Sequence, residues 1–119
     1  MLRIETYEDR VSFEPGQTVD GVAAWEFEEG GVPSWVEVRL FWRTLGKGDT
    51  DAVIVAAQRF DSPTSADAQL YSLRLPDGPY SYVGELLEVR WSVELVAHRE
   101  KRSERLDLTV SPTGRAVRG

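Results

Sequence analysis

Apolar and polar residues alternate repeatedly along this chain, and glycine, proline or aspartate interrupts the alternation about every ten residues. The alternation is clearest in residues 35–43 (WVEVRLFWR), 87–97 (LEVRWSVELVA) and 105–110 (RLDLTV). Because successive side chains of a strand point to opposite faces of its sheet, each stretch predicts a strand with one buried and one solvated face. The predicted core positions are Val36, Val38, Leu40, Trp42, Val89, Trp91, Val93, Leu95, Leu106, Leu108 and Val110.

Two other stretches, residues 19–27 and 52–60, are apolar at both alternating positions, which predicts central strands or β-bulges. Gly21 lies inside the first stretch and marks a bulge or a close approach of neighbouring backbone. Together with residues 2–7, 10–13 and 69–75, the chain has about eight predicted strands. A short helix fits only in residues 62–70, where Ser65 would be its N-cap. The predicted fold is all-β, a two-layer antiparallel β-sandwich of about eight strands, immunoglobulin-like in architecture.

The chain has 119 residues, the usual size of one domain with one hydrophobic core. Apolar periodicity is lost near the C-terminus, so we expect a single domain over residues 1–112 and a flexible tail over residues 113–119. The N-terminus lacks the apolar segment of a secretory signal, and no apolar run reaches the roughly 20 residues of a membrane helix. We therefore expect a cytoplasmic protein without an integral membrane segment.

The charge and the residue types exclude several functions. A net charge of −6 argues against nucleic acid as a partner, because affinity for the phosphate backbone needs a concentrated basic surface. The absence of cysteine excludes disulfides, thiolate metal sites and cysteine nucleophiles. The only histidine, His98, follows a strand beside Arg99 and has the pattern of a solvated turn residue.

Catalytic and metal-binding motifs are also incomplete. No G-x-S-x-G sequence occurs, and residues 49–60 begin like a calcium loop but have Val53 and Phe60 where oxygen ligands are required. We expect no enzyme activity, no cofactor and no bound metal. One alternative stays open: Glu26 and Glu28 share one face of a predicted strand, and a pair of carboxylates is all that a glycosidase requires.

Two turn-rich segments resemble a known family. Residues 13–21 (FEPGQTVDG) place Pro15 and Gly16 in a turn before a strand, and residues 73–91 (LRLPDGPYSYVGELLEVRW) combine LP, P-x-S and glycine before an alternating strand. Together they resemble the arrestin-like domain family over about residues 3–111. Trp91 stands where that family usually has tyrosine, and the family usually has two sandwiches in tandem whereas this chain has one. The resemblance implies an arrestin-like sandwich that binds proteins without catalysis, and no residue between tandem domains is carried over.

The second segment also has a direct physical interpretation. Leu75 ends a strand, Pro76 cannot donate a backbone hydrogen bond, and the residues that follow favour a reversal. Ser81 can bind nearby backbone, and Gly84 can adopt conformations closed to other residues. These residues predict a crossover from one sheet to the other.

Four aromatic residues are candidate partner contacts. Trp35 and Phe41 lie off the buried register of their strand and would form an apolar patch if both were exposed, although packing inside the sandwich is the alternative. Tyr80 and Tyr82 lie in the crossover, and an exposed tyrosine gives a large contact area at a small entropic cost.

Three basic residues, Arg99, Lys101 and Arg102, are further candidates for contact with an acidic partner or a membrane headgroup. They belong to residues 98–105 (HREKRSER), whose simpler interpretation is a charged hairpin tip that discourages association of strand edges.

These observations lead to three functional expectations. The first is a protein-binding or scaffold module that uses an edge strand, a loop set or self-association, with a protein partner or a second copy. The second is a carbohydrate-binding sandwich that uses Trp25, Trp35 or Tyr80 as a stacking platform. The third is a structural subunit of a larger assembly.

Overall fold

The computed structural model describes residues 1–46, 48, 50–98 and 102–119. Over these residues the chain forms ten β-strands, one 3₁₀ turn and no α-helix. The strands are β1 (Leu2–Thr6), β2 (Ser12–Phe13), β3 (Thr18–Glu26), β4 (Trp35–Gly46), β5 (Ala52–Asp61), β6 (Ala66–Arg74), β7 (Tyr82–Val83), β8 (Leu87–Ala97), β9 (Arg102–Val110) and β10 (Val117–Arg118). The 3₁₀ turn, η1, covers Tyr7–Asp9 between β1 and β2.

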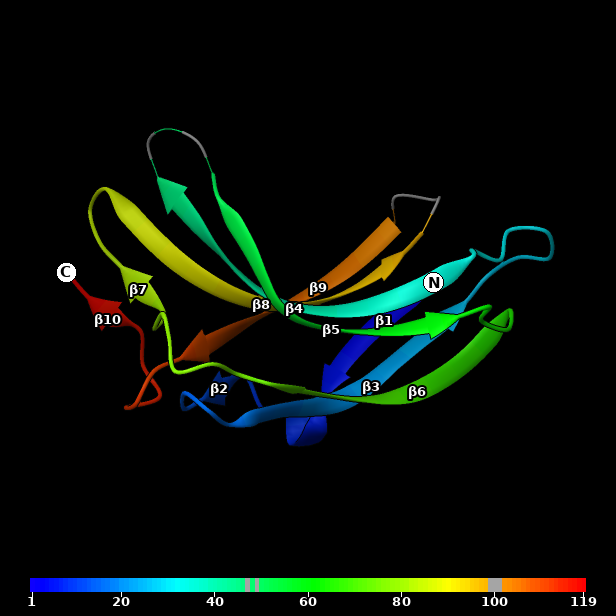
Figure 1. Cartoon of the computed structure of the whole chain (residues 1–119), viewed down its shortest axis with the longest axis horizontal. Helices are drawn as coiled ribbons and strands as arrows, with labels where there is room; N and C mark the ends of the chain where they lie inside the picture. The colour runs from blue at the N-terminus through cyan, green and yellow to red at the C-terminus, as the bar shows by residue number, and fades with distance from the viewer. Residues whose placement is uncertain (47, 49, 99–101) are drawn as a thin grey trace.

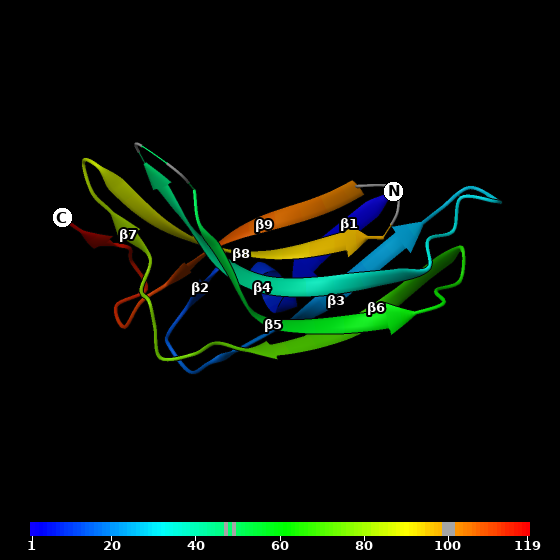
Figure 2. The same cartoon turned by 45° about the horizontal axis from the view of Figure 1, so that its top comes forward.

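The strands form two sheets, and the C-terminus lies at one end of the longest axis whereas the N-terminus lies in the opposite half (Figures 1 and 2). The smaller sheet has the order β1-β3-β6 and is antiparallel. The larger sheet has the order β10-β7-β8-β4-β5, in which β9 also pairs with β8, and β2 pairs with β9. All the long strand pairs are antiparallel, whereas two short pairs, β10 with β7 and β2 with β9, are parallel. The predicted two-layer β-sandwich is confirmed.

The hydrophobic core lies between the facing sides of the two sheets. Trp91 at its centre is fully buried, and its indole nitrogen donates a hydrogen bond of 2.8 Å to the carbonyl oxygen of Pro79. The predicted core positions that are buried are Val36, Val38, Leu40, Trp91, Val93, Leu95, Leu108 and Val110. The other three, Trp42, Val89 and Leu106, are partly buried. The alternation therefore identified the correct face of β4, β8 and β9.

Gly21 in β3 is a point of close approach and not a bulge. Its pairing with Thr6 of β1 and with Tyr71 of β6 is continuous in register. A Cβ atom at Gly21 would lie 1.9 Å from the carbonyl oxygen of Glu5 and 2.6 Å from the hydroxyl of Tyr71. The Tyr71 hydroxyl donates a hydrogen bond of 2.8 Å to that same Glu5 oxygen, so the tyrosine occupies the space that the glycine leaves open.

The two turn-rich segments that resemble arrestin-like domains lie next to each other. The amide of Gly16 donates to the carbonyl oxygen of Pro76 at 3.3 Å, and the amide of Leu75 donates to that of Gln17 at 2.9 Å. After Leu75 the chain leaves β6 in the smaller sheet and enters β7 in the larger one, which confirms the predicted crossover. Gly84 has no positive φ; it is required because the ring of Tyr82 lies 2.7 Å from where its Cβ would be.

β5 is an edge strand and not a central one. It pairs only with β4 in the described part of the chain, and it contains the predicted irregularity as a register shift. Ala56 faces Leu40 and Ile54 faces Phe41, so Val55 is the extra residue between two neighbouring pairs. The bulge explains why apolar residues occupy both alternating positions of this strand.

A side chain joins the edges of the two sheets where β5 approaches β6. The amide nitrogen of Gln58 in β5 donates to the carbonyl oxygen of Leu70 at 3.4 Å, and its amide oxygen accepts from the backbone nitrogen of Ser72 at 3.2 Å. Gln58 thus gives β6 the hydrogen bonds that a neighbouring strand would provide. The half of β5 before Gln58, Ala52–Ala57, lacks such a bridge among the described residues.

Two local expectations differ from the structure. Residues 66–70 are part of β6 and not of a short helix, because pairing with β3 overrides the local capping signal. In the segment expected to be a flexible tail, residues 117–118 form β10, and the amide of Val117 donates to the carbonyl oxygen of Ser81 at 2.8 Å. Backbone hydrogen bonds hold this strand, and they leave no signal in the pattern of apolar residues. The flexibility of residues 113–119 stays a prediction.

Candidate protein-binding surfaces

Trp35, the first predicted contact residue, is partly buried at the start of β4. Its ring stacks on that of His98 at a centroid distance of 4.5 Å and an interplanar angle of 10°. The guanidinium of Arg59 lies 4.6 Å from the centroid of the same indole, within the range of a cation–π contact. Trp35 therefore already has ring partners within the chain, and His98 has a packing role in addition to its exposed position in the turn.

Phe41, the second predicted contact residue, is not a surface residue. Its side chain is only 7% exposed, so it cannot contact a partner in the folded chain. It lies on the face of β4 opposite the core, where it is flanked by Ser92 of β8 and Ile54 of β5. Trp35 and Phe41 consequently form no joint exposed patch, and for Phe41 the alternative holds that its strand is covered on both faces at this position.

The two tyrosines of the crossover differ in exposure. Tyr80 is 42% exposed and remains a candidate contact residue. Tyr82, in β7, is partly buried, and its ring lies against Gly84 and Gly119. Of the three residues proposed as a carbohydrate platform, Trp25 is buried at 2% exposure and Trp35 has ring partners, so Tyr80 is the one exposed ring of that set.

Of the three basic candidates, Arg102 is exposed at the start of β9, whereas Arg99 and Lys101 lie outside the described residues. Arg102 pairs in register with Ala97, which itself pairs with Val36, so it lies at the same end of the sandwich as Trp35. Tyr80 lies in the crossover, between Pro79, whose carbonyl oxygen accepts from Trp91, and Tyr82, which pairs with Val89 near the start of β8. The predicted contact residues are thus divided between two ends of the molecule and do not form one site.

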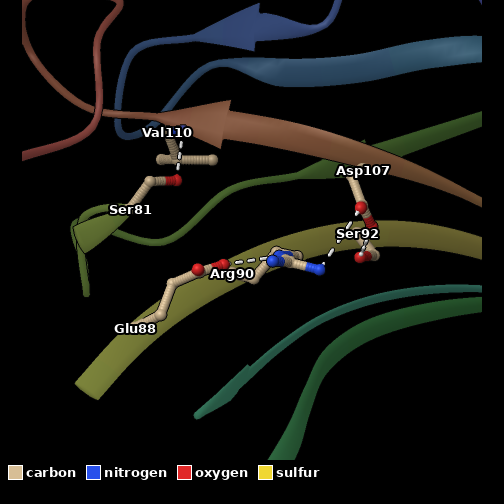
Figure 3. A network of polar contacts seen from close by, with 6 residues as sticks. All are labelled: Ser81, Glu88, Arg90, Ser92, Asp107 and Val110. Carbon is tan, nitrogen blue, oxygen red and sulfur yellow. Dashed lines mark hydrogen bonds and ion pairs between the residues drawn. The ribbon is translucent and has the colours of Figure 1, made fainter. Parts of the chain in front are cut away.

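A polar network covers the outer face of β8 and β9 (Figure 3). Ser92 donates to Asp107 at 2.7 Å, and Arg90 lies between Glu88, at 2.6 Å, and Asp107, at 3.9 Å. The hydrogen bond that Arg90 donates to Glu88 raises the pKa of Arg90, with a further contribution from the charge of Asp107. Because each charge has an opposite charge beside it, the network stabilises the sheet and offers no strong field to a ligand.

Arg43 of β4 is the neighbour of Arg90 in register. Burial lowers the pKa of the Arg43 guanidinium, and repulsion from Arg105 lowers it further. Its buried Nε has no hydrogen-bond partner among the described residues.

The alternative of a glycosidase that uses the carboxylates of Glu26 and Glu28 gains no support from the structure. Glu26 ends β3 and Glu28 lies beyond it, and both side chains are exposed. Among the described residues there is no cluster of three or more side chains suited to hold a metal ion. Over the same residues, no helix is long and apolar enough to cross a membrane.

The free edge of β5 is a candidate surface that the sequence did not identify. Residues 52–57 (AVIVAA) carry no charge, and Val53 and Ile54 are 41% and 54% exposed. The absence of charge over six residues was visible in the sequence. Its position at a sheet edge was not, because apolar residues at both alternating positions fit a central strand as well as a bulged one.

The described strands form an arrestin-like β-sandwich. Among solved structures, the chain is similar to the crystal structure of Spo0M, a sporulation control protein from Bacillus subtilis, with a TM-score of 0.61 and 16% sequence identity. The similarity covers 92% of this chain and 49% of the Spo0M chain, so this chain spans about half the length of that protein. No protein-family profile and no curated protein matches the sequence.

Proposed function

We propose that this chain is a non-catalytic protein-binding module that adds a strand at the free edge of β5, with a second copy of itself as the partner. The observation that carries the proposal is the uncharged edge formed by Ala52–Ala57. An unpaired edge presents backbone donors and acceptors that an additional strand can satisfy.

The distribution of charge distinguishes β5 from other strands at the sheet edges. β1 carries Arg3 and Glu5, and β9 alternates basic and acidic residues between Arg102 and Asp107. Charges of this kind discourage association of edges. The first half of β5 has none, so two chains that each carry a net charge of −6 can approach there with little direct repulsion.

Side chains on both faces of β5 would gain from pairing. Val53 faces Trp42 on the core side of the larger sheet, whereas Ile54 faces Phe41 on its outer side. An added strand would cover part of each side chain, and burial of apolar surface contributes about 25 cal/mol per Å². A symmetric pair of β5 strands closes on itself, which favours a dimer over an open chain of subunits.

The similarity to Spo0M concerns the fold, and this fold is consistent with a binding module. That protein is described as a sporulation control protein, which is a regulatory role. A subunit of a larger assembly would use the same edge, and the measured stoichiometry separates it from a dimer.

The test is the molar mass in solution by sedimentation velocity over a range of concentrations. We expect the wild type to approach 2 × 13.4 = 26.8 kDa as concentration rises. Ile54→Lys places a charge at the edge and should keep the chain at 13.4 kDa. Leu86→Lys alters another large apolar side chain, 71% exposed and distant from β5 in sequence, and should associate like the wild type.

A wild type that stays monomeric at the highest concentration would contradict self-association through β5. Equal association of the wild type and Ile54→Lys would place the interface elsewhere. Larger species of fixed composition would support the structural-subunit alternative.

A further inference from the structure

A groove of about 510 Å³ crosses the outer face of the smaller sheet, and Gln58 of β5, which follows the free edge Ala52–Ala57, also lines it. In register, Val22 of β3 is paired with Glu5 of β1 on one side and with Leu70 of β6 on the other. Directly paired residues share a face of a sheet, so these three side chains form one wall. Asp20 and Ser72 form the next row, and the backbone of Gly21 lies between the two rows.

The apolar part of the groove is unusually exposed. Leu70 is 76% exposed and Tyr7 is 71% exposed, and both line the groove together with Val22. Tyr7 is carried by η1, in which Glu8 and Asp9 have positive φ angles of 55° and 56°. A contiguous exposed patch of large apolar residues in a concave surface is typical of a binding site.

The charge of the groove indicates what it would bind. Its lining contains two carboxylates, Glu5 and Asp20, and no lysine, arginine or histidine. Glu5 has only a long ion pair of 3.5 Å with Arg3, in which both side chains are about half exposed, and such a pair contributes little. Asp20 makes no ion pair within the described part of the chain. The lining therefore favours a ligand that combines positive charge with an apolar group.

We infer that this groove binds a basic peptide segment of a partner protein, with a leucine-sized side chain between Tyr7 and Leu70 and flanking lysine or arginine residues beside Asp20 and Glu5. The inference does not depend on the pairing of β5, because the groove is lined by β1, η1, β3 and β6, and Gln58 is the one residue of β5 in its described lining. It gives the module a second binding site, and the partner there is of opposite charge to this chain.

The probe is the peptide acetyl-Lys-Leu-Leu-Lys-amide, titrated into ¹⁵N-labelled protein and followed by NMR. Two matched peptides separate the contributions: acetyl-Glu-Leu-Leu-Glu-amide reverses the charge, and acetyl-Lys-Ser-Ser-Lys-amide removes the apolar side chains. We expect saturable shifts at the amides of Gly21, Val22 and Leu70 with the first peptide, and at least tenfold weaker binding of the other two.

Two substitutions test the two parts of the groove. Leu70→Ser should weaken the binding of the first peptide about tenfold, which corresponds to about 1.4 kcal/mol. Asp20→Asn should weaken it several-fold at low salt and little at high salt, because screening already weakens the charge attraction. Leu86→Ser changes an equally exposed apolar residue outside the groove and should bind the peptide like the wild type.

Equal binding of the acidic and basic peptides, shifts located outside the groove, or no saturable shift at millimolar peptide would each overturn the inference. The titration is repeated on Ile54→Lys. If that variant binds the peptide normally, the groove is supported even where self-association through β5 has failed.

Discussion

At the scale of single residues, the smaller sheet depends on the fit between a glycine and a tyrosine. Gly21 leaves room for the phenol of Tyr71, whose hydroxyl donates to the carbonyl oxygen of Glu5 across the intervening strand. One side chain therefore links all three strands of this sheet. Burial raises the pKa of Tyr71 well above its ordinary value, and the charge of Asp20 adds to the rise.

Tyr71→Phe should reveal this link in the pH dependence of stability. Near neutral pH the substitution removes a buried hydrogen bond and should lower the free energy of unfolding by about 1 kcal/mol. In the unfolded chain the phenol ionises near pH 10, whereas the folded chain retains its proton to higher pH. The stability contributed by Tyr71 is thus fully present below about pH 10 and is lost as pH rises further.

The measurement is urea denaturation of both proteins from about pH 8 to about pH 11. The difference in stability between wild type and Tyr71→Phe should shrink across this range. Tyr7→Phe is the control, because Tyr7 is 71% exposed and should show little difference at any pH. A gap between wild type and Tyr71→Phe that stays constant to high pH would show that ionisation of Tyr71 is not coupled to folding.

At the scale of strands and loops, Ser81 gives the crossover the hydrogen bonds that a neighbouring strand would make with the end of β9. Its backbone amide donates to the carbonyl oxygen of Val110 at 2.7 Å, and its hydroxyl accepts from the amide of Val110 at 2.9 Å. Its own carbonyl accepts from Val117 in β10. A single buried serine therefore connects the end of β9 to the last strand.

Ser81→Ala should lower the free energy of unfolding by about 1–3 kcal/mol, because the buried amide of Val110 is left without its acceptor. Hydrogen exchange at Val110 should accelerate in the same variant. Ser12→Ala removes a hydroxyl that donates to Gly114 in an exposed position and should change stability by less than about 0.5 kcal/mol. Unchanged exchange at Val110 in Ser81→Ala would show that another group replaces the serine.

The strands differ in how well the sequence predicted them. The alternation of apolar and polar residues identified β4, β8 and β9 and their buried faces, because each of these strands has one buried and one solvated face. For β5 it predicted a central strand or a β-bulge, and the structure has the bulge, at Val55, in a strand at the sheet edge. β10 was missed, because two residues held by backbone hydrogen bonds leave no periodic signal.

The candidate surfaces were harder to predict than the fold. The register of Phe41 left both exposure and packing open, and the structure shows a side chain that is only 7% exposed. The groove on the smaller sheet brings together Tyr7, Val22 and Leu70, which are far apart in sequence and become neighbours only through strand register. Local patterns carry no information about such pairings.

At the scale of the whole molecule, the net charge of −6 acts in opposite directions on the two proposed surfaces. Two copies that pair through β5 repel each other at long range, whereas a basic peptide is attracted. Added salt screens both effects. We therefore expect self-association to strengthen, and peptide binding to weaken, as NaCl rises from about 0.05 to about 0.5 M.

Sedimentation equilibrium and peptide titration in the same buffers provide this comparison. Self-association that weakens with salt would indicate an interface held by ion pairs, which the uncharged edge of β5 cannot supply. Sedimentation equilibrium of the variant Ile54→Lys in the same buffers shows whether any salt-dependent association occurs through β5.

The uncharged run of β5 has a further consequence for the chain before it folds. A short segment of high β-propensity, without charge or proline, has the composition of segments that form cross-β aggregates. During synthesis or refolding, residues 52–57 are exposed before β4 covers one edge of the strand. The yield on refolding should therefore fall as the protein concentration rises.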